Sequence, residues 1–133
     1  MDALESFYGR RLYFMKIKYI TMIVKDMDES VRFYRDVMGF EVDSHYDLGD
    51  HGEITILRGD GETMVELIRN PVNKEGLFSV GMDVDDLEVT LQELRSRGAR
   101  VVMDPTPITV GKLAFIEDPN GVRIALIQHT DGN

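Results

Sequence analysis

The chain has 133 residues, with 15 Lys and Arg against 24 Asp and Glu, so its net charge at pH 7 is −9. This acidic excess disfavours nucleic acid and anionic membranes as partners, because both bind through basic surfaces. The chain has no cysteine, which excludes disulfides, thiolate metal sites and cysteine nucleophiles. Its length is typical of one domain with its own hydrophobic core.

The apolar runs are shorter than the roughly 20 residues that a membrane-spanning helix needs. The sequence begins with the acidic residues Asp2 and Glu5 rather than with a basic segment, so we expect no targeting segment. Because no cysteine suggests an oxidising compartment, we expect a cytoplasmic protein.

Residues 1–15 precede the first repeated element and have no counterpart later in the chain. This segment is rich in aromatic residues, including Phe7, Tyr8 and Tyr13. We interpret it as an N-terminal appendage that packs on its own domain, or alternatively as an arm that crosses a partner subunit.

Residues 16–69 carry the signals of one strand, one helix and three further strands. β-branched and aromatic residues over 17–24 predict the first strand. The spacing of apolar residues predicts a helix over 27–38, with Asp26 as its N-cap and Gly39 at its end. The remaining strands are predicted over 40–46, 53–58 and 62–69.

Residues 77–129 repeat this plan. The run VKDMD at 24–28 returns as VDDLE at 84–88, and ELI at 66–68 returns as ALI at 125–127. A helix is predicted over 87–97, with strands over 100–103, 112–117 and 122–129. The sequence therefore predicts one α+β domain, residues 16–129, built of two βαβββ modules, with residues 70–76 as a turn-rich linker.

Strand alternation predicts which side chains face away from the helices, toward a concave side of the sheet. Tyr19, Thr21, Met64 and Glu66 fall on this side in the first module. Ser79, Asp83, Arg123, Ala125 and His129 fall on it in the second, whereas Phe78 falls on the helix-covered face.

Glu66 is the main candidate for a functional residue. A carboxylate between Met64 and Ile68 on one strand face is unfavourable unless it has a role, and burial would make it a usable base or ligand-binding group. Two alternatives remain: Glu66 is solvated at an open surface, or it pairs with Arg123.

The run VKDMDESVRFY at 24–34, the Met-Gly-Phe at 38–40 and the run FIEDPNG at 115–121 together resemble the vicinal oxygen chelate superfamily. This superfamily contains glyoxalase I, the bleomycin-resistance proteins and extradiol dioxygenases, and the resemblance covers residues 16–128. It implies a curved mixed sheet that cups a small-molecule site. It also implies a homodimer in which modules of two chains complete the cup.

The resemblance places the four metal ligands of glyoxalase I, which read His, Glu, His and Glu, at Tyr19, Glu66, Ser79 and Ala125 of this sequence. Only Glu66 matches. A single carboxylate does not hold a divalent ion against water, so we expect no metal cofactor. The three histidines match none of these positions, and we interpret them as surface residues. They are His45, His51 and His129.

Two functional hypotheses remain, besides a regulatory or structural role. The first is a bleomycin-resistance-like protein that binds a small organic ligand without metal. The second is a glyoxalase-related lyase or isomerase, with Glu66 as general base next to a carbonyl and any divalent metal only weakly bound. The expected ligand-binding residues are Tyr19, Thr21, Met64, Ser79 and Phe115, with Glu66 as the candidate catalytic residue.

Overall fold

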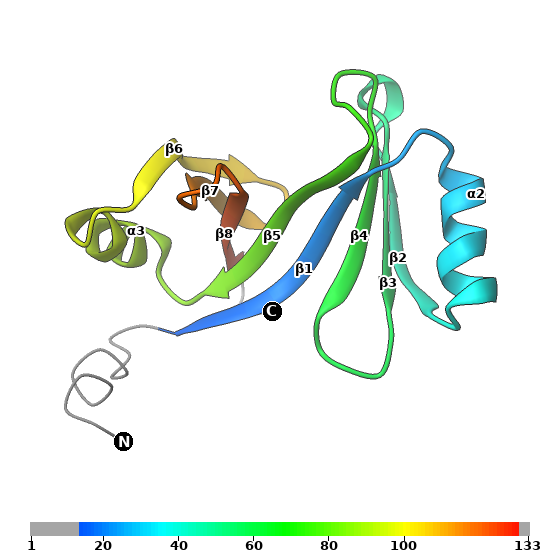
Figure 1. Cartoon of the computed structure of the whole chain (residues 1–133), viewed down its shortest axis with the longest axis horizontal. Helices are drawn as coiled ribbons and strands as arrows, with labels where there is room; N and C mark the ends of the chain where they lie inside the picture. Colours follow the sequence, from blue (N-terminus) through cyan, green and yellow to red (C-terminus); the bar gives the residue numbers. More distant parts are fainter. Residues whose placement is uncertain (1–13, 131–133) are drawn as a thin grey trace.

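The computed structural model describes residues 14–130. Its strands are β1 (Met15–Ile23), β2 (Glu41–Asp47), β3 (Glu53–Arg58), β4 (Met64–Arg69), β5 (Gly76–Val84), β6 (Arg100–Ile108), β7 (Gly111–Glu117) and β8 (Arg123–His129). They form one mixed sheet in the order β2-β3-β4-β1-β5-β8-β7-β6. The helices α2 (Met27–Arg32) and α3 (Leu87–Ser96) lie at opposite ends of the molecule, with the sheet between them (Figure 1).

Each half of the chain therefore has the βαβββ order, and the predicted α+β fold is confirmed. Within each half the first strand pairs in parallel with the last, β1 with β4 and β5 with β8. The two halves join where β1 pairs antiparallel with β5. The two halves thus form one continuous sheet. The assignment of residues 70–76 as a linker between them stays a prediction. The predicted appendage lies outside the described residues, except that β1 already begins at Met15.

Both helices begin at the predicted caps. The carboxylate of Asp26 accepts a hydrogen bond from the Glu29 backbone N–H, and that of Asp86 accepts one from Val89. The first helix differs from the prediction, because α2 changes after six residues into a π-helical segment, Phe33–Val37. Such segments hold an extra residue in one turn, which apolar spacing alone does not reveal.

Each helix covers its own hydrophobic cluster on the outer face of the sheet. Met27 of α2 packs on Leu57 and Leu67, whose side chains are fully buried. Leu87 and Leu91 of α3 pack on a second cluster, which includes Ala114, Val84 and Leu126. The other face of the central strands is thus free to line a cavity.

Two strand features depart from simple alternation. The pairing of β1 with β5 shifts register twice, at Lys18 of β1 and at Phe78 of β5. These two residues form β-bulges at equivalent positions of the two repeats. The strand β6 runs to Ile108, well beyond the predicted residue 103, although it contains Pro105 and Pro107. A proline fits there because β6 is an edge strand, where a missing backbone N–H leaves no partner unpaired.

The first cluster offers a direct test of the core. We expect Leu67→Ala to lower the free energy of unfolding by about 2–5 kcal/mol, because it leaves a cavity beneath α2. Val72→Ala is the matched control, since that side chain is 85% exposed. Denaturant titration of both variants measures the effect, and equal stability of the two would contradict this packing.

Candidate functional site

The sheet encloses a cavity of about 630 Å³ between the two halves of the chain. The strands β1 and β5 form its floor, with Tyr19, Thr21 and Ser79 facing inward. Its walls are mostly apolar and come from both halves, with Ile54, Ile56 and Ile68 on one side and Leu113, Phe115 and Ile127 on the other. Both halves of one chain therefore line the cup, and the expectation that modules of two chains complete it stays a prediction.

Most of the predicted site residues meet in this cavity. Tyr19, Thr21, Glu66, Ser79 and Phe115 all line it. Met64 does not belong to the lining, although it shares a strand with Glu66. It lies at the first residue of β4, where the strand begins beside the Arg58 end of β3.

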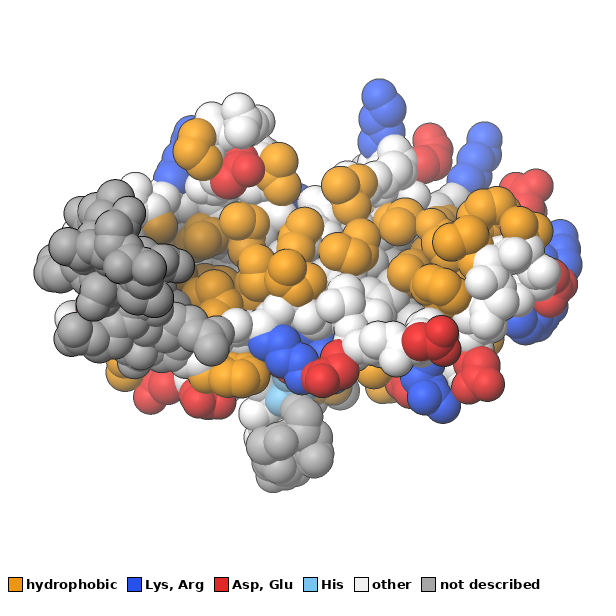
Figure 2. Space-filling view, turned by 60° about the horizontal axis from the view of Figure 1, so that its bottom comes forward, with side chains coloured by type: hydrophobic (Ala, Val, Ile, Leu, Met, Phe, Trp, Pro, Cys, Tyr) orange, Lys and Arg blue, Asp and Glu red, His pale blue; other side chains and the backbone are white. Residues whose placement is uncertain are grey.

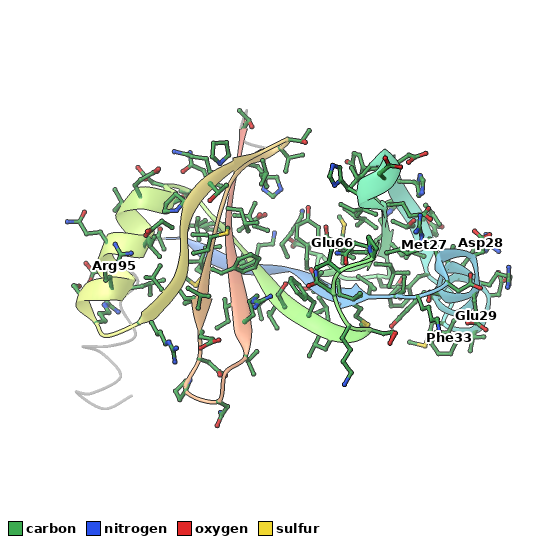
Figure 3. The ribbon with its side chains drawn as sticks, turned by 90° about the horizontal axis from the view of Figure 1, so that it is seen from above. Met27, Asp28, Glu29, Phe33, Glu66 and Arg95 are labelled. Atoms are coloured by element: carbon green, nitrogen blue, oxygen red, sulfur yellow. The ribbon has the colours of Figure 1, made fainter. Side chains whose placement is uncertain are left out.

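Glu66 lies near the middle of the molecule, between the two halves, whereas the labelled residues of α2 lie at one end (Figure 3). On the sheet it is level with Thr21 of β1, which in turn is paired with Ser79 of β5. The Thr21 hydroxyl donates a hydrogen bond of 2.7 Å to Glu66 Oε1. Thr21 and Ser79 are themselves buried, so this row of polar groups is the base of the cup.

The surroundings of Glu66 favour its neutral form. Burial raises the pKa of the Glu66 carboxyl, and the hydrogen bond from Thr21 only partly opposes this shift. Among the described residues, Glu66 forms no ion pair with Arg123. The alternative of a structural Glu66–Arg123 pair is therefore wrong.

Tyr19 is a second polar group on the floor. The pKa of the Tyr19 hydroxyl is raised to about 12. Burial is the largest cause, and the nearby negative charges of Glu66 and Asp83 add to it. The hydroxyl therefore keeps its proton at neutral pH and can donate it in a hydrogen bond.

Phe78 occupies a position that differs from the prediction. Phe78 lines the cavity rather than the helix-covered face, because the bulge in β5 reverses the alternation at this point. Its ring packs edge-on against Phe115, with centroids 6.3 Å apart. The Arg123 guanidinium lies 4.6 Å from the centre of the Phe78 ring and supports this aromatic pair through a cation–π contact.

Two of the three histidines line the cavity, and the burial of His129 corrects its assignment as a surface residue. His129 is largely buried, with 14% of its side chain exposed, and its Nδ1 lies 2.9 Å from Asp83 Oδ1. His45 is at the rim, where it contacts Glu53 at 2.9 Å and is half-exposed. His45 and His51 are both exposed, as predicted. Strand alternation already placed His129 and Asp83 on the concave side and was the signal for this pair.

The four positions that correspond to the glyoxalase I ligands do not fit a divalent metal ion. They offer a tyrosine that keeps its proton, a serine hydroxyl, a methyl group and the one carboxylate of Glu66. Residues 14–130 contain no cluster of three or more His, Asp or Glu side chains that could hold a metal. The donor set therefore disagrees with the site of the metal enzymes.

Comparison with known proteins gives the family. The model of the Glyoxalase/Bleomycin resistance protein/Dioxygenase superfamily matches residues 16–126. The chain belongs to this superfamily. The predicted resemblance is thereby confirmed over nearly the same residues.

Other members of the superfamily resemble the chain over most of its length. A probable lactoylglutathione lyase from Synechocystis sp. is 32% identical over 121 residues, which cover 81% of this chain and 92% of the relative. A lactoylglutathione lyase from Haemophilus influenzae is 26% identical over 126 residues, covering 86% of this chain and 93% of the relative.

Solved structures share the fold. A hypothetical protein from Bacillus halodurans superposes with a TM-score of 0.78 at 21% identity, covering 90% of this chain and 97% of the other. Methylmalonyl-CoA epimerase from Mycobacterium tuberculosis superposes with a TM-score of 0.73 at 21% identity, covering 86% and 88%. In the described part of this superfamily member, no helix is long and apolar enough to cross a membrane.

Glu66→Gln tests whether the carboxylate serves stability. Because burial raises its pKa above the unfolded value, the folded protein loses stability as the pH rises through that raised pKa. The glutamine variant has no such loss. We expect its unfolding free energy at pH 7 to lie within about 1 kcal/mol of wild type, and the difference to shift in favour of wild type as the pH falls toward about 4. A loss of several kcal/mol at pH 7 would instead identify Glu66 as a structural residue.

The donor set also predicts the metal content. After dialysis, we expect elemental analysis to find well under one Ni, Zn, Mn or Fe ion per chain, and lactoylglutathione formation from methylglyoxal and glutathione to stay at background. A full equivalent of metal that resists dialysis and disappears in Glu66→Ala would contradict this prediction.

Proposed function

We propose that the protein binds a small, mostly apolar organic molecule in the cup, with Glu66 as the group that recognises it. The observation that carries this proposal is one partly buried carboxylate at the base of a mostly apolar cavity. Its only hydrogen bond from a described residue comes from Thr21 to Oε1, so Oε2 is left for a ligand. A hydroxyl or ammonium group would satisfy it.

The charge of the cavity favours a neutral or cationic ligand. Glu66 and Asp47 line it, while no Lys or Arg of residues 14–130 does. An anionic ligand would meet these carboxylates with no Lys or Arg in the lining to contact it directly, which is costly in a partly buried site. This bleomycin-resistance-like mode of binding needs no metal ion.

A matched pair of probes tests the proposal. 4-Phenylbutylamine and 4-phenylbutanoate have similar size but opposite charge. We expect calorimetry to show the amine binding at least about tenfold more tightly, the gain of one charge-assisted hydrogen bond. Glu66→Gln should remove this preference, with Glu62→Gln, at an exposed turn, as the matched control. Equal or tighter binding of the carboxylate would refute the proposal.

The raised pKa of Glu66 favours proton transfer as a second candidate function. A carboxylate in this state can take a proton from a carbon next to a carbonyl, as in a glyoxalase-related lyase or isomerase. The discriminating measurement is deuterium uptake from D₂O by 4-phenylbutan-2-one in the presence of the protein. Uptake that is lost in Glu66→Gln would favour an enzyme, and its absence would favour a binding protein.

We also propose that the chain forms a homodimer through the outer face of the floor. Leu77 is level with Met22, and Ile17 with Met82, and both methionines face the helix-covered clusters. Ile17 and Leu77 therefore also lie on the outer face, but they are 46% and 65% exposed. Apolar side chains gather across the middle of one face of the molecule in Figure 2.

The position of this patch favours a second copy of the chain as its partner. Ile17 and Leu77 occupy equivalent positions of the two repeats, so an approximate two-fold axis passes between them. A surface with such internal symmetry suits the isologous contact of a two-fold dimer.

Leu77→Glu tests the dimer. We expect it to shift the sedimentation coefficient to that of a monomer, because it places two like charges in a desolvated contact. Val72→Glu, on an 85% exposed side chain of the preceding turn, should leave the dimer intact. A monomeric wild-type protein at micromolar concentration would show that the patch has no self-association role.

A further inference from the structure

The cup has a second polar end, formed by Asp83 and His129 of the second half. Both residues lie on the concave side, and Nδ1 of the histidine is 2.9 Å from the Asp83 carboxylate. No hydrogen bond from a described residue reaches Asp83 Oδ1, so the carboxylate acts on the ring mainly through its charge. The His129 ring also lies beside the Tyr19 ring, with centroids 6.3 Å apart.

This pair is not needed by the βαβββ repeat. The residue equivalent to Asp83 in the first half is Ile23, which is buried as part of the core, and the residue equivalent to His129 is Asn70. The first half builds the same strands with an apolar residue and an amide. The ionisable pair is therefore a special feature of one end of the cup.

The opposite side of the His129 ring is available to a ligand. When the neutral ring carries its proton on Nδ1, beside Asp83, the other ring nitrogen, Nε2, is an acceptor on the far side of the ring. Among the described residues neither Nε2 nor the Tyr19 hydroxyl has a hydrogen-bond partner, and both residues line the cavity.

Glu66 and His129 lie on opposite sides of the floor. Their strands, β4 and β8, are separated in the sheet by β1 and β5. Three strand spacings correspond to roughly 14 Å across the sheet. His129 also lies further along its strand, because Ile124 of β8 is level with Val80, next to Ser79. Tyr19, on β1, lies between them and is affected by the charges of both Glu66 and Asp83.

We propose that His129, held by Asp83, is a second ligand-binding residue, so that the cup selects a molecule with a polar group at each end of an apolar middle. One end, a hydroxyl or ammonium, binds Glu66, and the other, a hydroxyl, binds His129 Nε2. The ligand class is thus an amphiphilic diol or amino alcohol. This inference rests on the proposed ligand-binding function of Glu66 and adds the second contact.

Two phenols that differ by one hydroxyl test the inference. 4-Butylphenol has one polar end, and 4-(4-hydroxybutyl)phenol carries a second hydroxyl at the end of the same chain. In wild type we expect the diol to bind at least about threefold more tightly, within the range of one net hydrogen bond. If the far end of the cup were merely apolar, the added hydroxyl would weaken binding.

Variants locate the preference. His129→Phe keeps a ring against Tyr19 and should abolish the preference for the diol over 4-butylphenol. Asp83→Asn should reduce the preference for the diol, because the His129 ring loses the charge that orients the ring. His51→Phe, on the surface, is the matched control and should keep the full preference. The ¹⁵N resonance of His129 Nε2 should move on addition of the diol and not of 4-butylphenol.

The outcomes separate this inference from the proposal on which it rests. Binding of both phenols with equal affinity, or a preference that survives His129→Phe, would overturn the second contact alone. If Glu66→Gln binds 4-butylphenol as tightly as wild type, or if neither phenol binds at millimolar concentration, the Glu66 function fails as well.

Discussion

The antiparallel pairing of β1 with β5 is the interaction on which the rest of the molecule depends. It joins two βαβββ halves into one sheet and, in doing so, brings Thr21 level with Ser79 at the floor of the cup. The helices bind the outer faces at the far ends, so the inner face of this central pair has no helix to cover it. A cavity between the halves follows directly from this arrangement.

The energetic cost of the site is concentrated in a few groups. The hydrophobic clusters beneath α2 and α3 provide the burial that stabilises each half, and they contain no Asp, Glu, Lys, Arg or His side chain. Glu66, by contrast, is held in surroundings that disfavour its charge. Such a group contributes little to folding, which is why its chemistry points to a ligand rather than to the core.

The sequence predicted the fold well because its signals were local and appeared twice. The caps at Asp26 and Asp86, and the glycines that end each helix, specify the same plan in both halves. Alternation then identified Tyr19, Thr21, Glu66 and Ser79 as residues of one face. All of these features depend on neighbouring residues along the chain, and periodicity reports them directly.

The sequence pattern failed to predict features in which one extra residue or a tertiary contact overrides the periodicity. A bulge turns Phe78 into the cavity, and a π-helical turn follows α2, because each inserts a residue that no spacing rule anticipates. Proline normally argues against a strand, but β6 accepts it at the sheet edge. His129 was placed on the correct face, yet only the fold shows that Asp83 lies beside it.

The walls of the cavity belong to different halves of the chain, and this gives a bound molecule a mechanical effect. A ligand that touches both walls acts as a non-covalent cross-link between units otherwise joined by a single strand pair and a short connection. Local opening of either half would require the ligand to leave first, so occupancy should couple their fluctuations and make unfolding more cooperative. The rates of amide hydrogen exchange in β1 and β5 would then fall together on ligand binding, because the central strands become more rigid.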